Sequence, residues 1–270
     1  MTRARRRSTT ILGGALAFAM LGTPPPANAQ ASDPPVELVL NVPESRIDVY
    51  EHGEHRARYR VSVGMDGYET PPGRYRVTHA VWNPWWHPPD SEWARGRKPE
   101  APGPRNPMGR VKLHFSHLLY IHGTPELAWL GRPASRGCVR MANEDLIELA
   151  KYLHRKASPR VPASTIEALI ADADRTRRID LARPVPFRVV YHIAEVRDGN
   201  LHIYPDVYGK VGAAFEEEVR AVLREHGVDL DDVDRAKLER LLKKGRTRKV
   251  SMALETLTSS EAAGSGGSAR

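Results

Sequence analysis

The segment IHGTPELAWLGRPASRGCVRM, residues 121–141, holds the only cysteine of the 270-residue sequence, Cys138. A histidine, His122, lies sixteen residues before it. A thiol with an ordinary pKa is only a few per cent thiolate at neutral pH, so a cysteine nucleophile needs an imidazole or a cation close to it. His122 is the candidate imidazole, and Arg136 and Arg140 are the candidate cations. We therefore expect a fold that brings the two ends of this segment together, with Cys138 as the nucleophile and His122 as its base.

The surroundings of Cys138 favour a reactive thiol over an inert one. A single cysteine is more often a small buried hydrophobic residue, but such a residue normally lies in an apolar, periodic run. Here the neighbours are small, basic and turn-forming, and Gly137 permits backbone amides to approach a tetrahedral oxyanion. A structural zinc site needs several cysteine and histidine ligands at short spacing, and this chain has one cysteine. The pattern therefore indicates a nucleophile rather than a metal site.

Two halves of this segment resemble a known family. His122-Gly123-Thr124 and Ser135-Arg136-Gly137-Cys138-Val139-Arg140-Met141 are similar to the signature of the L,D-transpeptidase catalytic domain of the YkuD type, a histidine followed at a distance by Ser-His-Gly-Cys-hydrophobic-Arg. Arg136 stands where many members carry a second histidine. The resemblance implies Cys138 as nucleophile, His122 as proton donor and acceptor, and no metal or cofactor. It also implies substrate-binding or supporting roles for five further residues, Gly123, Ser135, Arg136, Gly137 and Arg140.

The resemblance also implies a reaction on peptidoglycan stem peptides. The Cys138 thiolate attacks the carbonyl of a diamino acid that precedes D-alanine, D-alanine leaves, and an amine from a second stem or a wall-linked lipoprotein takes the acyl group. An L,D-carboxypeptidase or endopeptidase that hydrolyses stems or lipoprotein tethers would use the same residues. A third alternative is a cell-wall-binding protein without catalytic activity.

Arg136 and Arg140 leave two questions open. A permanent cation two residues before the thiol is expected to lower the pKa of Cys138, unless the Arg136 guanidinium points to solvent. Arg140 is expected to bind substrate, with a salt bridge to Glu144 or Asp145 as the alternative.

The N-terminus, residues 1–29, is typical of a secretory signal. Four arginines precede an apolar run, Ile11–Leu21, and Ala27-Asn28-Ala29 resembles a cleavage site. The run is shorter than the roughly twenty apolar residues of a membrane span, so we expect export across the inner membrane to the periplasm or cell wall, with no span after cleavage. Cleavage removes four of the 41 basic residues and none of the 33 acidic ones, which lowers the net charge from +8 to +4. This excess is too small to indicate nucleic-acid binding.

Alternating or continuous apolar runs predict a mainly β catalytic domain over residues 30–180, an antiparallel, sandwich-like fold with a few helices. The last predicted strand ends where it delivers His122, and Asn143 is expected to cap the following helix. Residues 181–250 are expected to form a small mixed α/β extension with a β-hairpin and helices, similar to that of larger periplasmic L,D-transpeptidases, and residues 251–270 a disordered tail. Strands are expected at 36–42, 46–50, 56–63, 74–81, 111–115 and 118–121.

The stretch 82–109 is irregular and rich in proline and tryptophan. Its tryptophans argue against disorder, because disordered linkers contain few aromatic residues. We expect either a lid or groove wall over the site or a packed surface flap.

Overall fold

The computed structural model describes residues 35–258. The predicted signal peptide lies outside the described residues, as does the part of the predicted tail from residue 259 on. Between residues 35 and 258 there is no helix that is both long enough and apolar enough to cross a membrane.

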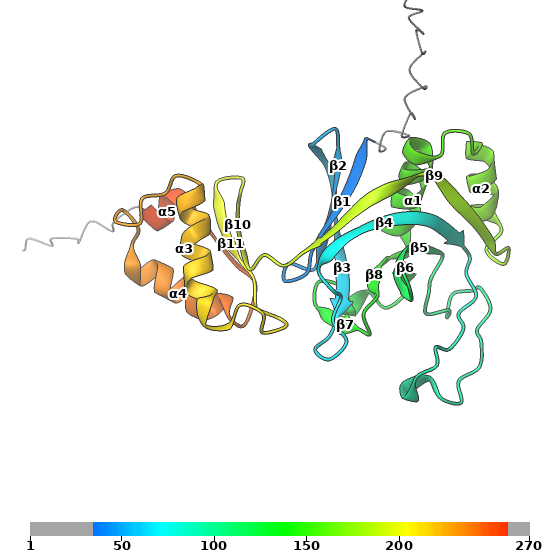
Figure 1. Cartoon of the computed structure of the whole chain (residues 1–270), viewed down its shortest axis with the longest axis horizontal. Coiled ribbons are helices and arrows are strands. Elements are labelled where there is room, and N and C mark those ends of the chain that lie inside the picture. Colours follow the sequence, from blue (N-terminus) through cyan, green and yellow to red (C-terminus); the bar gives the residue numbers. More distant parts are fainter. Residues whose placement is uncertain (1–34, 259–270) are drawn as a thin grey trace, which may run out of the picture. The chain divides into compact units, whose positions relative to one another are not determined.

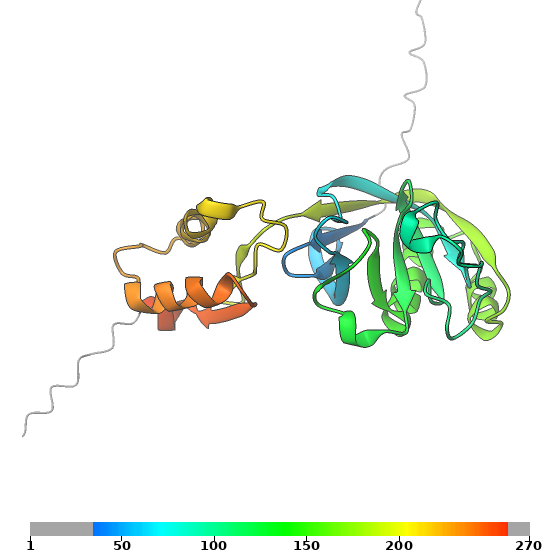
Figure 2. The same cartoon turned by 90° about the horizontal axis from the view of Figure 1, so that it is seen from below.

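Nine strands form the first sheet, in the order β2-β1-β9-β4-β5-β6-β8-β3-β7 (Figures 1 and 2). Because β2 also pairs with β3, the sheet closes on itself into a barrel-like arrangement. The mainly β prediction is confirmed, but the sandwich is wrong, since one sheet closes where two facing sheets were expected. The strands are β1 (Val36–Asn41), β2 (Arg46–Glu51), β3 (Glu54–Gly64), β4 (Gly73–Trp82), β5 (Val111–Ser116), β6 (Leu119–Thr124), β7 (Pro133–Ser135), β8 (Val139–Ala142) and β9 (Arg177–Val190).

Three pairings in this sheet join distant parts of the chain in parallel, so the sheet is mixed and not antiparallel as expected. β1 pairs in parallel with β9, β3 with β7, and β6 with β8. A parallel pair needs a crossover connection, and the connection between β6 and β8 is the segment that lies between the two motif halves. His122 lies inside β6 and not after its end, because the strand continues to Thr124.

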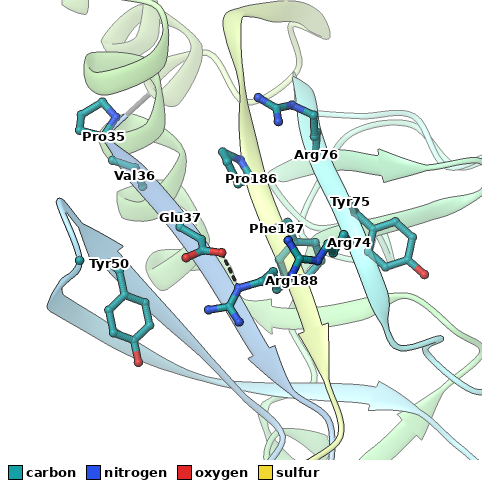
Figure 3. Close-up of a pocket in the computed structure, with 11 residues that line it drawn as sticks. Pro35, Val36, Glu37, Tyr50, Arg74, Tyr75, Arg76, Pro186, Phe187 and Arg188 are labelled. Atoms are coloured by element: carbon teal, nitrogen blue, oxygen red, sulfur yellow. Dashed lines mark hydrogen bonds and ion pairs between the residues drawn. The ribbon is translucent and has the colours of Figure 1, made fainter. Parts of the chain in front are cut away.

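A cavity of ≈ 580 Å³ opens over β2, β1, β9 and β4 (Figure 3). Arg74, Arg76 and Arg188 line it together with Glu37, which forms an ion pair with Arg188 at 2.5 Å. None of the lining residues belongs to the segment 121–141.

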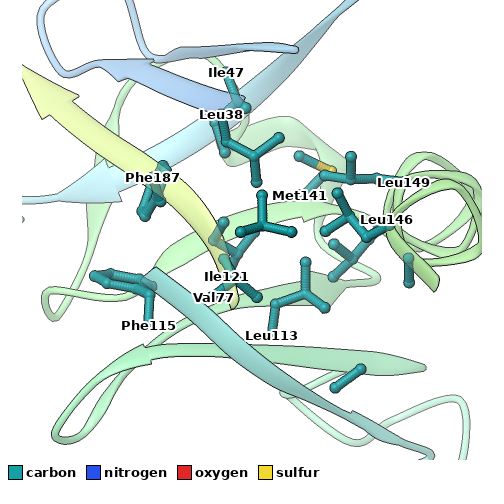
Figure 4. Close-up of a cluster of buried hydrophobic side chains, with 14 of the residues drawn as sticks. Leu38, Ile47, Val77, Leu113, Phe115, Ile121, Met141, Leu146, Leu149 and Phe187 are labelled. Carbon is teal, nitrogen blue, oxygen red and sulfur yellow. The ribbon is translucent and has the colours of Figure 1, made fainter. Parts of the chain in front are cut away.

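The core of this sheet is apolar and is completed by a helix. Side chains such as Leu38, Ile121 and Phe187 converge with Leu146 and Leu149 of helix α1 (Asn143–Ala157), as Figure 4 shows. The helix packs against the sheet through the apolar residues that its sequence places at intervals of three and four. Helix α2 (Ala163–Ala171) adds Ile166 and Leu169 to the same core.

The predicted cap at Asn143 is not formed, since Ala142 precedes the helix and makes no side-chain cap bond. The Asn143 side chain instead accepts a hydrogen bond from the amide of Arg110, Oδ1 to N 2.9 Å. The start of α1 is therefore joined to the loop that precedes β5.

The elements after β9 include a second sheet, which has three strands. These elements share a second core, in which Leu201, Phe215 and Leu238 are buried. In Figure 2, α4 (orange) runs beside β12. β9 continues to Val190 within the first sheet, past the predicted domain boundary at residue 180. The predicted disordered tail begins with ordered residues, because β12 pairs with β11 and Leu257 is buried. The elements are β10 (Ala194–Arg197), β11 (Asn200–Ile203), α3 (Phe215–Glu225), α4 (Arg235–Gly245), β12 (Val250–Ala253) and α5 (Leu254–Thr258).

Candidate active site

The parallel pairing of β6 with β8 joins the two motif halves. Ile121 is paired with Val139, and His122 with Arg140. Cys138 directly precedes β8, so its backbone lies beside the strand that carries His122. The register therefore brings the two ends of the segment 121–141 side by side.

A row of polar side chains crosses the sheet at His122. The register pairs Lys112 of β5 with His122, His122 with Arg140 of β8, and Arg140 with Ser62 of β3. Residues that are directly opposite on neighbouring strands point to the same face of a sheet. Since Ile121 faces the apolar core, this row faces the opposite side, with an imidazole between two cations.

His122 is a neutral base in this environment. Its side chain is buried, and its Nδ1 lies 2.8 Å from the carbonyl oxygen of Gly123. A carbonyl only accepts, so Nδ1 carries the proton and Nε2 is the basic nitrogen. Burial lowers the pKa of His122 to about 4, and the charges of Arg140 and Lys112 act in the same direction, against the carbonyl of Gly123.

The thiol of Cys138 is also neutral at rest. Burial raises its pKa, and a main-chain hydrogen bond from Tyr120 and the charges of Arg140 and Lys112 offset that rise in part. The sulfur makes a long contact of 3.6 Å to the carbonyl of Leu118. A thiol with a raised pKa and an imidazole with a lowered pKa do not form a preformed ion pair.

The loop before Cys138 is fixed by hydrogen bonds to its carbonyl groups. Thr70 Oγ1 donates to the carbonyl of Gly137 at 2.8 Å, and Ser135 Oγ donates to the carbonyl of Cys138 at 2.5 Å. Gly137 has a φ of +100°, which side chains with a Cβ rarely adopt. This residue must therefore stay glycine to keep the peptide before the thiol in place.

Gly123 is required for a different reason. A Cβ at this position would lie 2.1 Å from Asn143 Oδ1, the atom that holds the amide of Arg110. Any larger residue would force apart Asn143 at the start of α1 and Gly123 in β6, whose own carbonyl fixes the ring of His122.

The two arginines of the motif have different surroundings. The Arg136 guanidinium lies 4.4 Å from the ring centroid of Trp93 and 5.9 Å from that of Tyr68, which is a cation–π arrangement. It points neither to solvent alone nor toward the sulfur, and the cations that lower the pKa of Cys138 are Arg140 and Lys112. Arg140 lies 3.7 Å from Glu126, which is a different carboxylate from the two expected.

The tryptophan- and proline-rich stretch is a packed loop that borders this site. Asn106 Nδ2 donates to the carbonyls of Pro84, Glu100 and Ala101 at 2.9–3.1 Å. Its far end reaches the cysteine loop through the contact between Trp93 and Arg136. Internal hydrogen bonds of this kind fix a long loop without regular secondary structure.

Comparison with known proteins identifies the domain. Residues 35–165 match the family model described as the L,D-transpeptidase catalytic domain, YkuD. This segment belongs to that family.

Relatives of this L,D-transpeptidase domain carry matching names. The chain is 29% identical over 160 residues to the Escherichia coli protein named "Probable L,D-transpeptidase YbiS", which covers 55% of this chain and 51% of that protein. It is 31% identical over 161 residues to the Salmonella typhimurium protein named "Probable L,D-transpeptidase ErfK/SrfK", covering 56% and 46%. The chain thus spans about half the length of the curated relatives it matches. A solved L,D-transpeptidase from Mycobacterium tuberculosis aligns with a TM-score of 0.37 at 17% identity, over 58% of each chain.

Two residues of the candidate site are absent from the set predicted from the sequence. Lys112 is paired with His122, and its charge acts on both the imidazole and the thiol. Thr70 is fully buried and holds the peptide before the thiol. A lysine in an alternating strand usually faces solvent, so only the strand register reveals Lys112, whereas Thr70 lies in the loop Gly64–Gly73, which reads as a turn.

Proposed function

We propose that this protein is a cysteine acyltransferase of the L,D-transpeptidase type that acts on peptidoglycan stem peptides. The observation that carries the proposal is the β6–β8 register, which brings Cys138 beside the buried, neutral His122. The match of residues 35–165 to the L,D-transpeptidase family model supports the same reaction class.

The first half-reaction forms a thioester. Nε2 of His122 takes the proton of the Cys138 thiol while the sulfur attacks the carbonyl of the diamino acid that precedes D-alanine. The carbon–nitrogen bond then breaks, the proton on Nε2 passes to the leaving amine, and D-alanine departs. Because both groups are neutral at rest, proton transfer and attack are coupled.

The second half-reaction transfers the acyl group. An amine of a second stem peptide, or of a wall-linked lipoprotein, attacks the thioester and gives its proton to His122. The carbon–sulfur bond breaks, and the thiol recovers the proton. Water as acceptor would give an L,D-carboxypeptidase or endopeptidase instead, with the same residues in the same roles.

The supporting residues act on the charges of the reaction. Gly137 leaves the amide of Cys138 close to the reacting carbonyl, where an N–H stabilises the oxyanion. Arg140 lies next to His122 in the row and is suited to bind a substrate carboxylate, while Ser135 holds the loop. Action on the wall requires export, for which the predicted signal peptide at residues 1–29 would provide the route.

Mass spectrometry of the mature protein incubated with purified tetrapeptide muropeptides tests the proposal. Cross-linked dimers together with free D-alanine support the transpeptidase, and tripeptide monomers alone support the carboxypeptidase. Cys138→Ala should abolish both products. Neither product from the wild-type protein would favour the wall-binding alternative, and full activity of Cys138→Ala would refute the mechanism.

A carbapenem provides an independent test of the nucleophile. The thiol of Cys138 should open the lactam, forming a carbon–sulfur bond as the lactam carbon–nitrogen bond breaks and the thiol proton passes to the nitrogen. Intact-mass and peptide analysis should find one adduct, on Cys138. An adduct on another residue would contradict the assignment.

A further inference from the structure

A chain of hydrogen bonds leads to the Cys138 loop from a segment beyond the family match, residues 191–212. Its origin is Asp206, whose carboxylate accepts from the hydroxyl of Tyr191 at 2.6 Å and from the amides of Lys210, Val211 and Gly212 at 2.8–2.9 Å. Burial opposes ionisation here, but these donors outweigh it and lower the pKa of Asp206. An ionised carboxylate with four donors is a rigid anchor.

The hydroxyl of Tyr191 connects Asp206 to Tyr208 through two hydrogen bonds. The Tyr191 hydroxyl, which donates to Asp206, accepts from the amide of Tyr208 at 2.7 Å. The two rings also stack, with centroids 5.6 Å apart at an interplanar angle of 30°. Both rings pack against the core of the first sheet.

The hydroxyl of Tyr208 then fixes the loop between β3 and β4. It donates to the carbonyl of Gly64 at 2.7 Å and accepts from the amide of Thr70 at 3.1 Å. The side chain of Thr70 closes the same turn, since its Oγ1 accepts from the amide of Gly64 at 2.9 Å. The turn has no spare room, because a Cβ on Gly64 would lie 2.0 Å from the carbonyl oxygen of Tyr68.

Thr70 is the link from this turn to the nucleophile. Its Oγ1 donates to the carbonyl of Gly137 at 2.8 Å. The carbonyl and N–H of one trans peptide point in opposite directions in one plane, so an anchored Gly137 carbonyl also sets the direction of the Cys138 N–H. That N–H is the donor that the proposed mechanism uses for the oxyanion.

We propose that Tyr208, supported by Tyr191 and Asp206, is a positioning residue that aims the Cys138 amide at the oxyanion through Thr70. The inference rests on the proposed role of Cys138 as an acyl-accepting nucleophile. It gives the segment 191–212 a part in the chemistry, although the family match ends at residue 165.

Comparing two reactions of the same thiol tests this role. Acylation by a carbapenem passes through an oxyanion, whereas alkylation by iodoacetamide is a displacement that forms none. Tyr208→Phe removes one hydroxyl and keeps the ring stacked on Tyr191. We expect the single-turnover acylation rate to fall about tenfold, because a misaimed donor loses part of its stabilisation of the transition state, and the alkylation rate to stay within about twofold.

Tyr204→Phe is the matched control. The Tyr204 hydroxyl also donates to a carboxylate, Glu195 at 2.6 Å, but Glu195 is not part of the hydrogen-bond chain from Asp206 to Thr70. This variant should leave both rates unchanged. If Tyr208→Phe fails to fold, Thr70→Val and Thr70→Ser replace it: the valine should slow acylation selectively and the serine, which keeps the hydroxyl, should restore it.

The outcomes separate the two proposals. A wild-type protein that takes no acyl group on Cys138 refutes the proposed function, and the positioning role with it. A wild-type protein that is acylated as fast as a folded Tyr208→Phe refutes only the positioning role. An equal loss of acylation and alkylation also refutes it, because that result describes a general disturbance of the loop.

Discussion

Each of the two sheets places a histidine in the middle of a row of three paired residues. In the first sheet the row is Lys112, His122 and Arg140, and in the second it is Glu195, His202 and Ser251. Burial lowers the pKa of both histidines, and nearby cations lower it further, Arg140 and Lys112 at His122 and Arg197 and Arg58 at His202. The difference is a carboxylate: Glu195 opposes the lowering at His202, and no carboxylate among the described residues acts in this way on His122.

The comparison teaches that a strand position alone does not make a histidine a candidate base. What distinguishes His122 is the neighbouring strand, because β8 follows directly after a thiol. His202 has a hydroxyl residue, Ser251, and a carboxylate on its two sides, and the chain's only cysteine directly precedes a strand of the first sheet. The following predictions compare the two rows directly.

The largest difference is expected from His122→Ala. Loss of a general base typically slows a reaction about 10²- to 10⁴-fold, so carbapenem acylation of Cys138 should fall by this order. His202→Ala should leave the rate unchanged. Intact-mass measurement of adduct formation over time gives both rates. If the two variants slow the reaction equally, His122 does not act as the base for Cys138.

The pH dependence tests whether burial and the flanking cations lower the pKa of His122. The base must be unprotonated, and the pKa of His122 is lowered to about 4, so its contribution is present above that pH and lost below it. The acylation rate of the wild-type protein should therefore not fall between pH 7 and pH 5, and should decline about tenfold per unit below about pH 4. Circular dichroism at each pH is the control for folding. A decline centred near pH 6.5 would mean that His122 behaves as an unperturbed imidazole.

A smaller effect is expected from Lys112→Met. The positive charge of Lys112 lowers the pKa of Cys138, so its removal should raise that pKa further and leave less thiolate at a given pH. Alkylation by iodoacetamide at pH 8 should slow by about two- to tenfold, since one pKa unit is a tenfold change in thiolate. Lys243→Met, at an exposed position of α4, is the matched control. An unchanged pH profile of alkylation would show that the charge of Lys112 does not act on the thiol of Cys138.

The smallest effect is expected from Arg136→Ala. Its guanidinium lies over Trp93, so its loss should free the loop and leave the pH profile of Cys138 alkylation unchanged. Wild-type and variant curves that coincide, with faster proteolysis within residues 83–109 of the variant, are the expected result. A curve displaced to higher pH would restore the expectation that Arg136 activates the thiol.

Much of the first sheet could be predicted from its alternating runs. Predicted and observed strands agree within about two residues for β1 to β5, because local alternation reflects which residues are buried. The closure into a barrel-like arrangement could not be predicted. It depends on long-range pairings such as that of β3 with β8, which leave no mark in the local pattern.

The candidate site, too, could be predicted from the sequence only in part. The motif names Cys138 and His122, and their roles remain proposals. Residues that reach the site from distant segments have no local signal: Lys112 through strand register, and Thr70 and Tyr208 through hydrogen bonds across the fold. Asn143 illustrates the converse case, in which a typical capping residue serves a tertiary contact instead.

Because β6 and β8 pair directly in the sheet, the relative position of His122 and Cys138 does not depend on the length of the connection between the two strands. Both strands are fixed by the sheet, and Gly131 is already held to Val61 by its amide at 2.7 Å. The stretch 125–129 is exposed, and it contacts the sheet through Glu126, which lies 3.7 Å from Arg140 and donates its amide to Thr124. Doubling the length of a flexible loop costs about 0.6 kcal/mol of closure entropy, so this stretch can lengthen considerably without moving the base from the nucleophile. The number of residues between a histidine and a cysteine in sequence is consequently a poor guide to their distance in such a sheet, and a search for similar centres by spacing would overlook chains with longer connections.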